Sequence, residues 1–164
     1  MTAYNGCMTF RHLIVLPVLA LSLGLAPIAQ GQRNAAATKV DVFKTATCGC
    51  CSKWVDHLKA EGFEVTFQNI DQTELDKVKA KYGIPREAHS CHTALVGAYV
   101  IEGHVPASEI KRLLKERPAV VGIAVPGMPL GSPGMESSGV KPQPYNVLSI
   151  DKQGRTQVFS TIRP

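Results

Sequence analysis

Three cysteines lie within four positions of this chain, in the segment TATCGCCSKWVDHL: Cys48, Cys50 and Cys51. They directly precede a segment with the apolar spacing of an amphipathic helix. Gly49 allows a tight turn, so the sulfur atoms of sequence neighbours can converge. Adjacent cysteines such as Cys50 and Cys51 are poor disulfide partners, whereas a shared metal ion tolerates the arrangement. The cluster therefore indicates a site, and 164 residues are enough for one domain around it.

The first 31 residues have the pattern of a secretory signal peptide. Arg11 is followed by an apolar run over residues 13–28 and by the small-x-small triplet at 29–31. This pattern predicts export, with cleavage after Gly31. A membrane anchor is the alternative, because the run approaches a spanning length. Two prolines and the Ala-x-Gly end favour removal, after which we expect no membrane attachment.

The remaining sequence predicts one α/β domain at residues 39–164, preceded by a short flexible leader at 32–38. Apolar spacing, glycines and prolines predict the order β-α-β-α-β-β-α over residues 39–117. Residues 125–144 are so rich in Gly, Pro and Ser that neither helix nor strand is credible there. The last 20 residues predict a β-hairpin.

Two details of this pattern concern the second strand and the second helix. Phe63, Val65 and Phe67 are expected on one face of the strand. Asp71 and Glu74 have capping-box spacing at the start of the helix.

The charge pattern argues against a nucleic-acid partner. The formal net charge of +5 falls by one, to +4, when Arg11 leaves with the signal peptide. No block of Lys and Arg and no basic-aromatic stripe stands out in the sequence. We attribute the mild positive charge to ordinary solubility. The sequence gives no indication of the oligomeric state.

Export would leave four cysteines in an oxidising compartment, because Cys7 is removed and Cys91 joins the three described above. An even number fits a disulfide framework, but three of the four lie too close together to staple distant segments. A Cys48–Cys51 disulfide with Cys50 unpaired is the structural alternative to a metal site.

The order of elements and the cysteine position resemble the thioredoxin fold over residues 39–117. Cys48-Gly49-Cys50-Cys51 follows a strand and opens a helix. The segment SCHTALV falls where thioredoxins carry a cis-proline followed by Thr, with His92 in the place of the proline. This resemblance implies that Cys91 and His92 face Cys48 and Cys51 across one pocket.

Four blocks, CGCCSKWVDHL, SCHTA, EGHVPASEI and AVPGMPLGSPGME, occur in this order over residues 40–136. They are closely similar to periplasmic copper-resistance proteins of the CopG type, a thioredoxin-like family long catalogued as a domain of unknown function. The resemblance implies a thioredoxin-like mixed sheet flanked by helices, with an added Met/Pro/Gly loop and a C-terminal β-hairpin. It also implies copper at a thiolate-rich site, with several ions bridged by cysteines and cycling between Cu(I) and Cu(II). Copper ions and other periplasmic copper-handling proteins are the partners that it suggests.

The chemistry of the residues agrees with copper. Thiolates favour Cu(I), and thioethers and imidazoles extend the same set, whereas magnesium or calcium would require carboxylates. A helix N-terminus also stabilises anionic sulfur at Cys48. The candidate metal ligands are Cys48, Cys50, Cys51, Cys91, His92, His104, Met128 and Met135.

Three of these candidates have ordinary alternatives. Met128 and Met135 lie in a loop with little core to fill, so we weigh a ligand or lid role against packing. His104, in EGHVP, is expected on the cysteine edge of the fold, although a lone histidine is more often a polar surface residue. Trp54 is expected to pack the first helix on the sheet.

The sequence leaves three functions open. The first is a copper-binding redox protein for copper tolerance. The second is a thiol-disulfide oxidoreductase with Cys48 as nucleophile and Cys51 as resolving thiol; the extra Cys50, and Cys91-His92 in place of the proline, argue against it. The third is structural zinc in a Cys3His site, which does not require the methionine loop.

Overall fold

The structure is a computed structural model that describes residues 1–2 and 37–163. The predicted signal peptide at 1–31, apart from its first two residues, and most of the predicted leader at 32–38 lie outside these ranges and stay predictions. In the described part, the elements in chain order are β1 (Lys39–Lys44), α1 (Gly49–Ala60), β2 (Glu64–Asn69), α2 (Gln72–Lys81), the 3-10 turn η1 (Arg86–Ala88), β3 (His92–Val96), β4 (Tyr99–Glu102), α3 (Ala107–Glu116), β5 (Gly122–Ala124), β6 (Tyr145–Ile150) and β7 (Thr156–Ile162).

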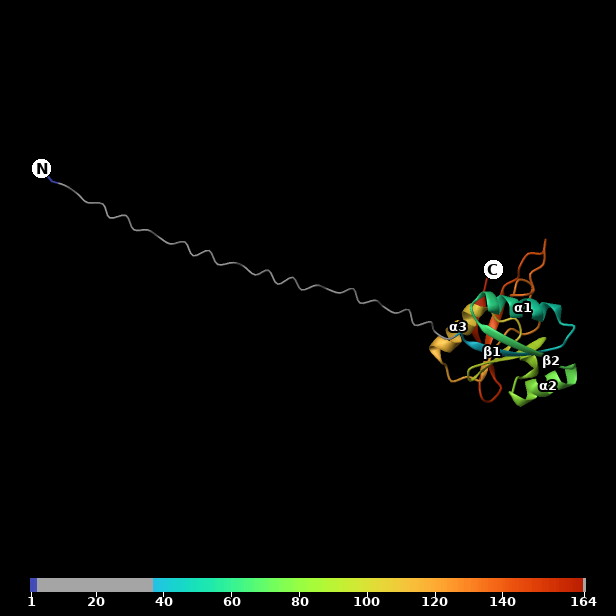
Figure 1. Ribbon diagram of the computed structural model, residues 1–164. Coiled ribbons are helices and arrows are strands. Elements are labelled where there is room, and N and C mark those ends of the chain that lie inside the picture. Colours follow the sequence, from blue (N-terminus) through green and yellow to red (C-terminus); the bar gives the residue numbers. More distant parts are fainter. Residues whose placement is uncertain (3–36, 164) are drawn as a thin grey trace. The chain divides into compact units, whose positions relative to one another are not determined.

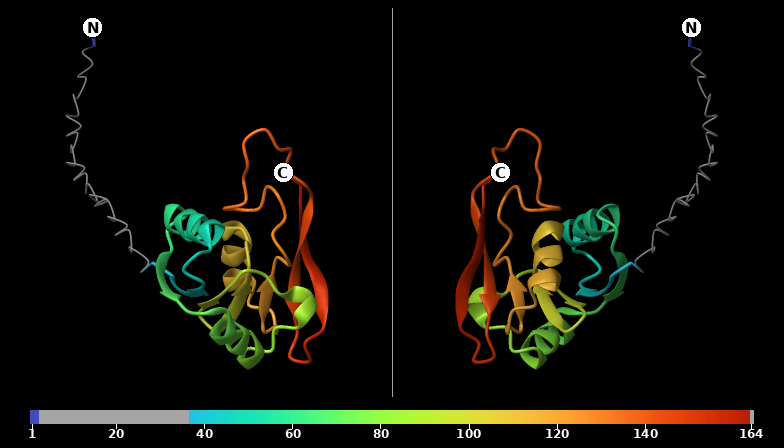
Figure 2. Two further views of the ribbon diagram at one scale, coloured as in Figure 1. Left: turned by 90° about the vertical axis from the view of Figure 1, so that its right-hand side faces the viewer. Right: turned by 90° about the vertical axis from the view of Figure 1, so that its left-hand side faces the viewer.

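The strands form one seven-stranded sheet in the order β2-β1-β3-β4-β5-β6-β7. β1 pairs with β2 in parallel and β4 with β5 in parallel, while the other neighbours are antiparallel. Figure 1 shows α1 and α3 on one side of the sheet and α2 on the other. The terminal hairpin β6-β7 lies at the edge opposite β2 (Figure 2). The mixed, helix-flanked sheet predicted from the sequence is therefore confirmed.

Local sequence signals explain where the helices begin and end. The side chain of Asp71 accepts a hydrogen bond from the Glu74 N–H at 2.9 Å, which caps α2 as the spacing predicts. α1 is followed by Gly62 at φ +89°, a conformation that glycine adopts without steric cost. α3 follows Pro106 and ends before Arg117 and a second proline.

The core consists of two apolar layers, one on each face of the sheet. The larger layer joins α1 and α3 to β1 and β3, with Trp54, Leu58, Ile110 and Leu113 fully buried. The smaller layer lies on the other face and contains Ile84, Ala88, Val100, Ala124 and Ile150. Burial of these side chains is the main stabilising contribution, because each large one adds about 1.5–3 kcal/mol.

Two features differ from the sequence-based expectation. The sequence assigns no strand at residues 122–124, yet β5 links β4 to the terminal hairpin. Three residues are too few to show a period, and partners on both sides hold them in the sheet. The sequence predicts Phe67 on the same face as Phe63, but Phe67 is 49% exposed, because β2 is an edge strand and the core ends before it.

Within the residues that the structure describes, no helix combines the length and the apolar character needed to cross a bilayer.

Candidate metal centre

The antiparallel register of two central strands brings the cysteine segments together. Lys44, at the end of β1, pairs with His92, at the start of β3. The chain that leaves β1 therefore reaches the first turn of α1 at the edge where Cys91 enters β3. This explains how Cys91 meets Cys51, 40 positions away in sequence, as the thioredoxin resemblance implies.

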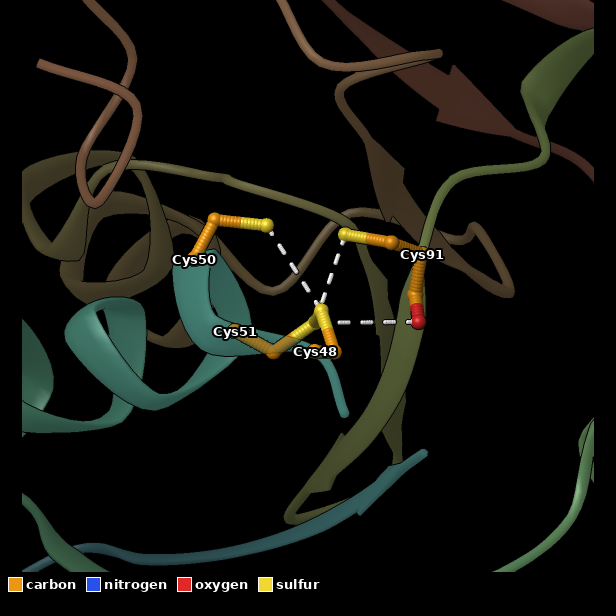
Figure 3. A group of neighbouring side chains, drawn as sticks. All are labelled: Cys48, Cys50, Cys51 and Cys91. Atoms are coloured by element: carbon orange, nitrogen blue, oxygen red, sulfur yellow. Dashed lines mark hydrogen bonds between the residues drawn. A yellow bond between two sulfur atoms is a disulfide. The ribbon is translucent and has the colours of Figure 1, made fainter. Parts of the chain in front are cut away.

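The four described cysteines form one sulfur cluster, with all Sγ atoms within 4.8 Å of one another. Cys48 and Cys51 form a disulfide, with their Cα atoms 5.4 Å apart. The Sγ of Cys50 lies 3.6 Å from that of Cys48, and the Sγ of Cys91 lies 3.4 Å from that of Cys51. Figure 3 shows Cys50 and Cys91 pointing toward the paired sulfurs from two sides. The predicted convergence of the four cysteines is confirmed. The structure also contains the Cys48–Cys51 disulfide, which the sequence offers as the alternative to a metal site.

The helix and the surrounding burial act on the thiols in opposite ways. Cys48 is the N-cap of α1, and the first turn contains no acidic side chain, so the helix dipole favours anionic sulfur there once the disulfide is reduced. Burial, followed by the nearby Cys50 thiol, raises the pKa of Cys91 to about 12. Cys91 is thus a protonated thiol in the metal-free protein at neutral pH, and a metal ion must displace that proton.

Two buried imidazoles lie beside Cys91 and form a second group with it. His104 Nε2 is 3.0 Å and His92 Nδ1 is 3.5 Å from the Cys91 sulfur. The three donor atoms lie within 4.8 Å of one another. Both histidines are 0% exposed, so the surface interpretation of His104 is wrong.

Burial determines the charge of both imidazoles. It lowers the pKa of His92 well below its ordinary value, and repulsion from His104, when that ring is protonated, and from Lys79 adds to this effect. Burial also lowers the pKa of His104, while the Pro133 carbonyl and Glu136 act in the opposite direction. Both rings are therefore neutral at pH 7, the form in which histidine binds metals.

The position of His104 is set by the loop that carries the methionines. Its Nδ1 donates a hydrogen bond to the Pro133 carbonyl at 2.8 Å, which leaves the Nε2 lone pair facing Cys91. Hydrogen bonding of the second ring nitrogen to a carbonyl is the usual way in which proteins orient a metal-binding histidine. A sequence-remote carbonyl thus selects the tautomer.

The methionine loop lies against the first turn of α1. Gly134 has φ +86°. A Cβ atom at this position would lie 2.7 Å from the Cys50 carbonyl oxygen and 2.8 Å from the backbone nitrogen of Trp54. Met135 is half-buried beside this contact, whereas Met128 is 53% exposed. The loop therefore covers the cysteine edge, and its two methionines differ in their access to solvent.

Trp54 packs α1 on the sheet, as expected, and also contacts the site. Its Nε1 donates to the Val105 carbonyl at 2.8 Å, and its ring centroid is 4.3 Å from that of His92. His57, in the same helix, accepts the Ala107 N–H at the start of α3 at 3.2 Å, which is a structural contact away from the cluster.

A buried ion pair that the sequence does not predict holds the segment around Cys91 in place. Lys79 Nζ donates to Glu102 Oε1 at 2.5 Å and to Thr93 Oγ1 at 3.1 Å. The same Glu102 oxygen accepts the Ser90 N–H at 2.6 Å, one residue before Cys91. In the sequence, the ion pair is indicated only by the carboxylate of Glu102 next to the apolar residues of YVIE. Its partner Lys79 lies 23 positions away.

The fold and the site define a thioredoxin-like protein with a cluster of thiols and imidazoles where thioredoxins place their dithiol. A family model described as a protein of unknown function, DUF411, matches residues 88–135. Two solved structures of the copper resistance protein CopG, form 2 and form 1, are each 41% identical to this chain, with a TM-score of 0.71. They cover 77% and 78% of this chain, and in both cases 99% of the solved chain is matched. No curated protein matches. The chain belongs to the CopG family.

Proposed function

We propose that this protein binds copper at the cysteine and histidine cluster and contributes to copper tolerance in the periplasm. The observation that carries the proposal is the convergence of four sulfur atoms within 4.8 Å. The two similar solved structures are of proteins described as copper resistance proteins, which favours copper over other metals that bind thiolates. Export by the predicted signal peptide would place the site in the periplasm.

The donor atoms fit copper in both of its biological oxidation states. In the described part of the chain, neither group of clustered donors includes a carboxylate. With all four cysteines reduced, sulfur donors suit Cu(I), and bridging thiolates would join more than one ion. Imidazole donors from His92 and His104 also suit Cu(II), so the same cluster supports cycling between the two states.

A thiol-disulfide oxidoreductase is the second candidate, and the Cys48–Cys51 disulfide favours it. Cys48 is partly exposed at the helix N-terminus and Cys51 is buried, the arrangement expected of an attacking and a resolving thiol. Two features disfavour it. Cys50 and Cys91 crowd the disulfide, and His92 stands in the place of the proline.

An anaerobic Cu(I) titration tests the two candidates. The chain from residue 32, which contains the whole described fold, is reduced and titrated against a competing chelator, and the metal is counted by elemental analysis. We expect tight binding of more than one copper per chain. Efficient insulin reduction by a protein that binds no copper would instead establish the oxidoreductase.

Variants of the cluster connect the titration to the geometry. Because Cys91 shares the sulfur cluster, Cys91→Ser is expected to weaken copper binding nearly as much as Cys48→Ser. Ser149→Ala, in β6, is the control and should leave the copper content unchanged. Visible absorption that depends on copper after exposure to air would exclude a purely structural zinc site, since zinc keeps one oxidation state.

A further inference from the structure

The two groups of donor atoms share a single residue. The first group is Cys48, Cys50, Cys51 and Cys91, and the second is Cys91, His92 and His104. The Cys48–Cys51 disulfide takes two sulfurs from the first group and none from the second. A complete set of three donors therefore persists when the dithiol is oxidised.

The second group has the geometry of a prepared site. Three donors around a first-row metal ion with bonds of about 2.0–2.3 Å stand about 3.5–4 Å apart. The Cys91 sulfur is 3.0 Å from His104 Nε2 and 3.5 Å from His92 Nδ1, so a small outward movement admits an ion. The Pro133 carbonyl already holds His104 in the ligand tautomer. Trp54 at 4.3 Å and the second imidazole at 5.0 Å, measured between ring centroids, hold His92 in place.

A buried polar atom supports the same conclusion. His92 Nε2 has no hydrogen-bond partner among the described residues, although the ring is 0% exposed. An apolar side chain would fill this position without that cost, which is about 1–3 kcal/mol for a buried unsatisfied group. A role for the other ring nitrogen, Nδ1, which faces Cys91, as a metal ligand would explain why a histidine occupies this buried position.

We propose that the chain has two copper-binding states, selected by the Cys48–Cys51 pair. With the pair reduced, copper binds at the four cysteines. With the disulfide formed, one Cu(II) ion binds at Cys91, His92 and His104. Two imidazoles and one thiolate in a trigonal arrangement are the ligands of copper sites that accept Cu(II). This inference rests on the proposed function and specifies how the site changes with the thiol state.

Cys91 is the pivot between the two states, because it belongs to both groups. Conversion of the Cys48–Cys51 pair takes two electrons and two protons: the two thiols lose them when the disulfide forms, and a small disulfide such as oxidised glutathione accepts them and is released as two thiols. Copper enters the second group already as Cu(II), so the step includes no change in the oxidation state of copper. Cys50 lies outside the second group. It is therefore a ligand in the reduced state alone.

The test uses copper sulfate and the chain from residue 32 with its Cys48–Cys51 disulfide formed by oxidised glutathione and verified by mass spectrometry. Elemental analysis should find one copper per chain, with a visible thiolate-to-copper absorption band. His104→Asn keeps a donor for the Pro133 carbonyl but removes the Nε2 ligand. It should lower the affinity of the disulfide form at least about 100-fold, beyond the loss expected when a residue supporting a ligand is replaced.

Matched variants separate this site from the sulfur cluster. His89→Ala replaces a half-buried histidine outside both groups and should change nothing. Cys50→Ser should lower copper binding by the reduced protein and leave the disulfide form at one copper. The double variant Cys48→Ser/Cys51→Ser, which needs no oxidation, should also bind one Cu(II). Circular dichroism verifies that each variant is folded.

Two results would overturn the inference. One is a disulfide form that binds no copper while the reduced form does; the proposed function would then stand. The other is a disulfide form of His104→Asn that retains full affinity. If neither form of the parent chain binds copper, the proposed function fails together with the inference.

Discussion

The buried pair of Lys79 and Glu102 offers a strong test of how the fold supports the site. The two side chains are 2% and 0% exposed, and their charged atoms are 2.5 Å apart. Replacement of Lys79 by Met removes the cation and leaves the carboxylate buried. Loss of one partner of a buried ion pair costs about 3–5 kcal/mol, since the remaining charge has no compensation. For a domain of this size that corresponds to a melting temperature lower by about 10–20 °C.

The cost of Lys79→Met should depend on pH in a defined direction. Burial raises the pKa of Glu102, and Lys79 counteracts the rise. Without the lysine the pKa rises further, so the folded variant holds a proton that the unfolded chain has released. Stability therefore falls as pH rises from the unfolded carboxyl pKa, about 4.3, toward neutrality. The variant should be closest to the parent protein near pH 4–5 and furthest from it at pH 7.

Urea unfolding at pH 5 and pH 7, followed by the fluorescence of the single tryptophan, Trp54, measures both effects. The matched control is Lys77→Met in the same helix, because the Lys77–Glu74 pair has a distance of 2.6 Å but is 66% and 52% exposed. An exposed pair contributes about 0–1 kcal/mol. Adding Glu102→Gln to Lys79→Met should recover part of the loss. The reasoning is refuted if Lys79→Met is no less stable than the control, or if its deficit does not grow with pH.

Three further predictions concern the loop, the tryptophan and the imidazoles. Gly134→Ala should destabilise by about 2–4 kcal/mol through backbone clash and strain, whereas Gly139→Ala, with open space around it, should cost about 1 kcal/mol; chemical unfolding measures both. Trp54→Phe loses a buried hydrogen bond and should cost about 1–2 kcal/mol in the same assay. In the metal-free protein, the lowered pKa values of His92 and His104 mean that the unfolded chain takes up protons first. Stability should therefore fall as pH drops below about 6.5, and a flat profile between pH 6.5 and 5 in thermal melts would contradict this.

Much of the fold follows from local sequence signals. The cap at Asp71, the glycine after α1 and the prolines around α3 set helix limits with little help from distant residues. The stretch at 125–144 contains neither helix nor strand, as its composition predicts. These features depend on backbone preferences that each residue carries wherever it lies. β5 has no such signal and exists because its neighbours pair with it.

The candidate site divides in the same way. The sequence alone predicts that Cys48, Cys50 and Cys51 lie close together, since they occupy the N-cap and first turn of one helix. The position of Cys91 was inferred from a resemblance, and the register of β1 with β3 supplies its physical reason. The sequence places His104 on the cysteine edge but does not decide between a metal ligand and a surface residue, because burial depends on what folds over the side chain.

Taken alone, the sequence determined the type of fold, the helix limits and the presence of a thiol cluster, because these depend on short-range geometry and on side-chain chemistry. The tertiary structure decided which imidazoles join the cluster, which tautomer His104 adopts against Pro133, and that Lys79 neutralises Glu102 beneath it. Each of these depends on contacts between segments 20 or more positions apart or on burial. Such contacts form only after the hydrophobic layers have closed around the sheet.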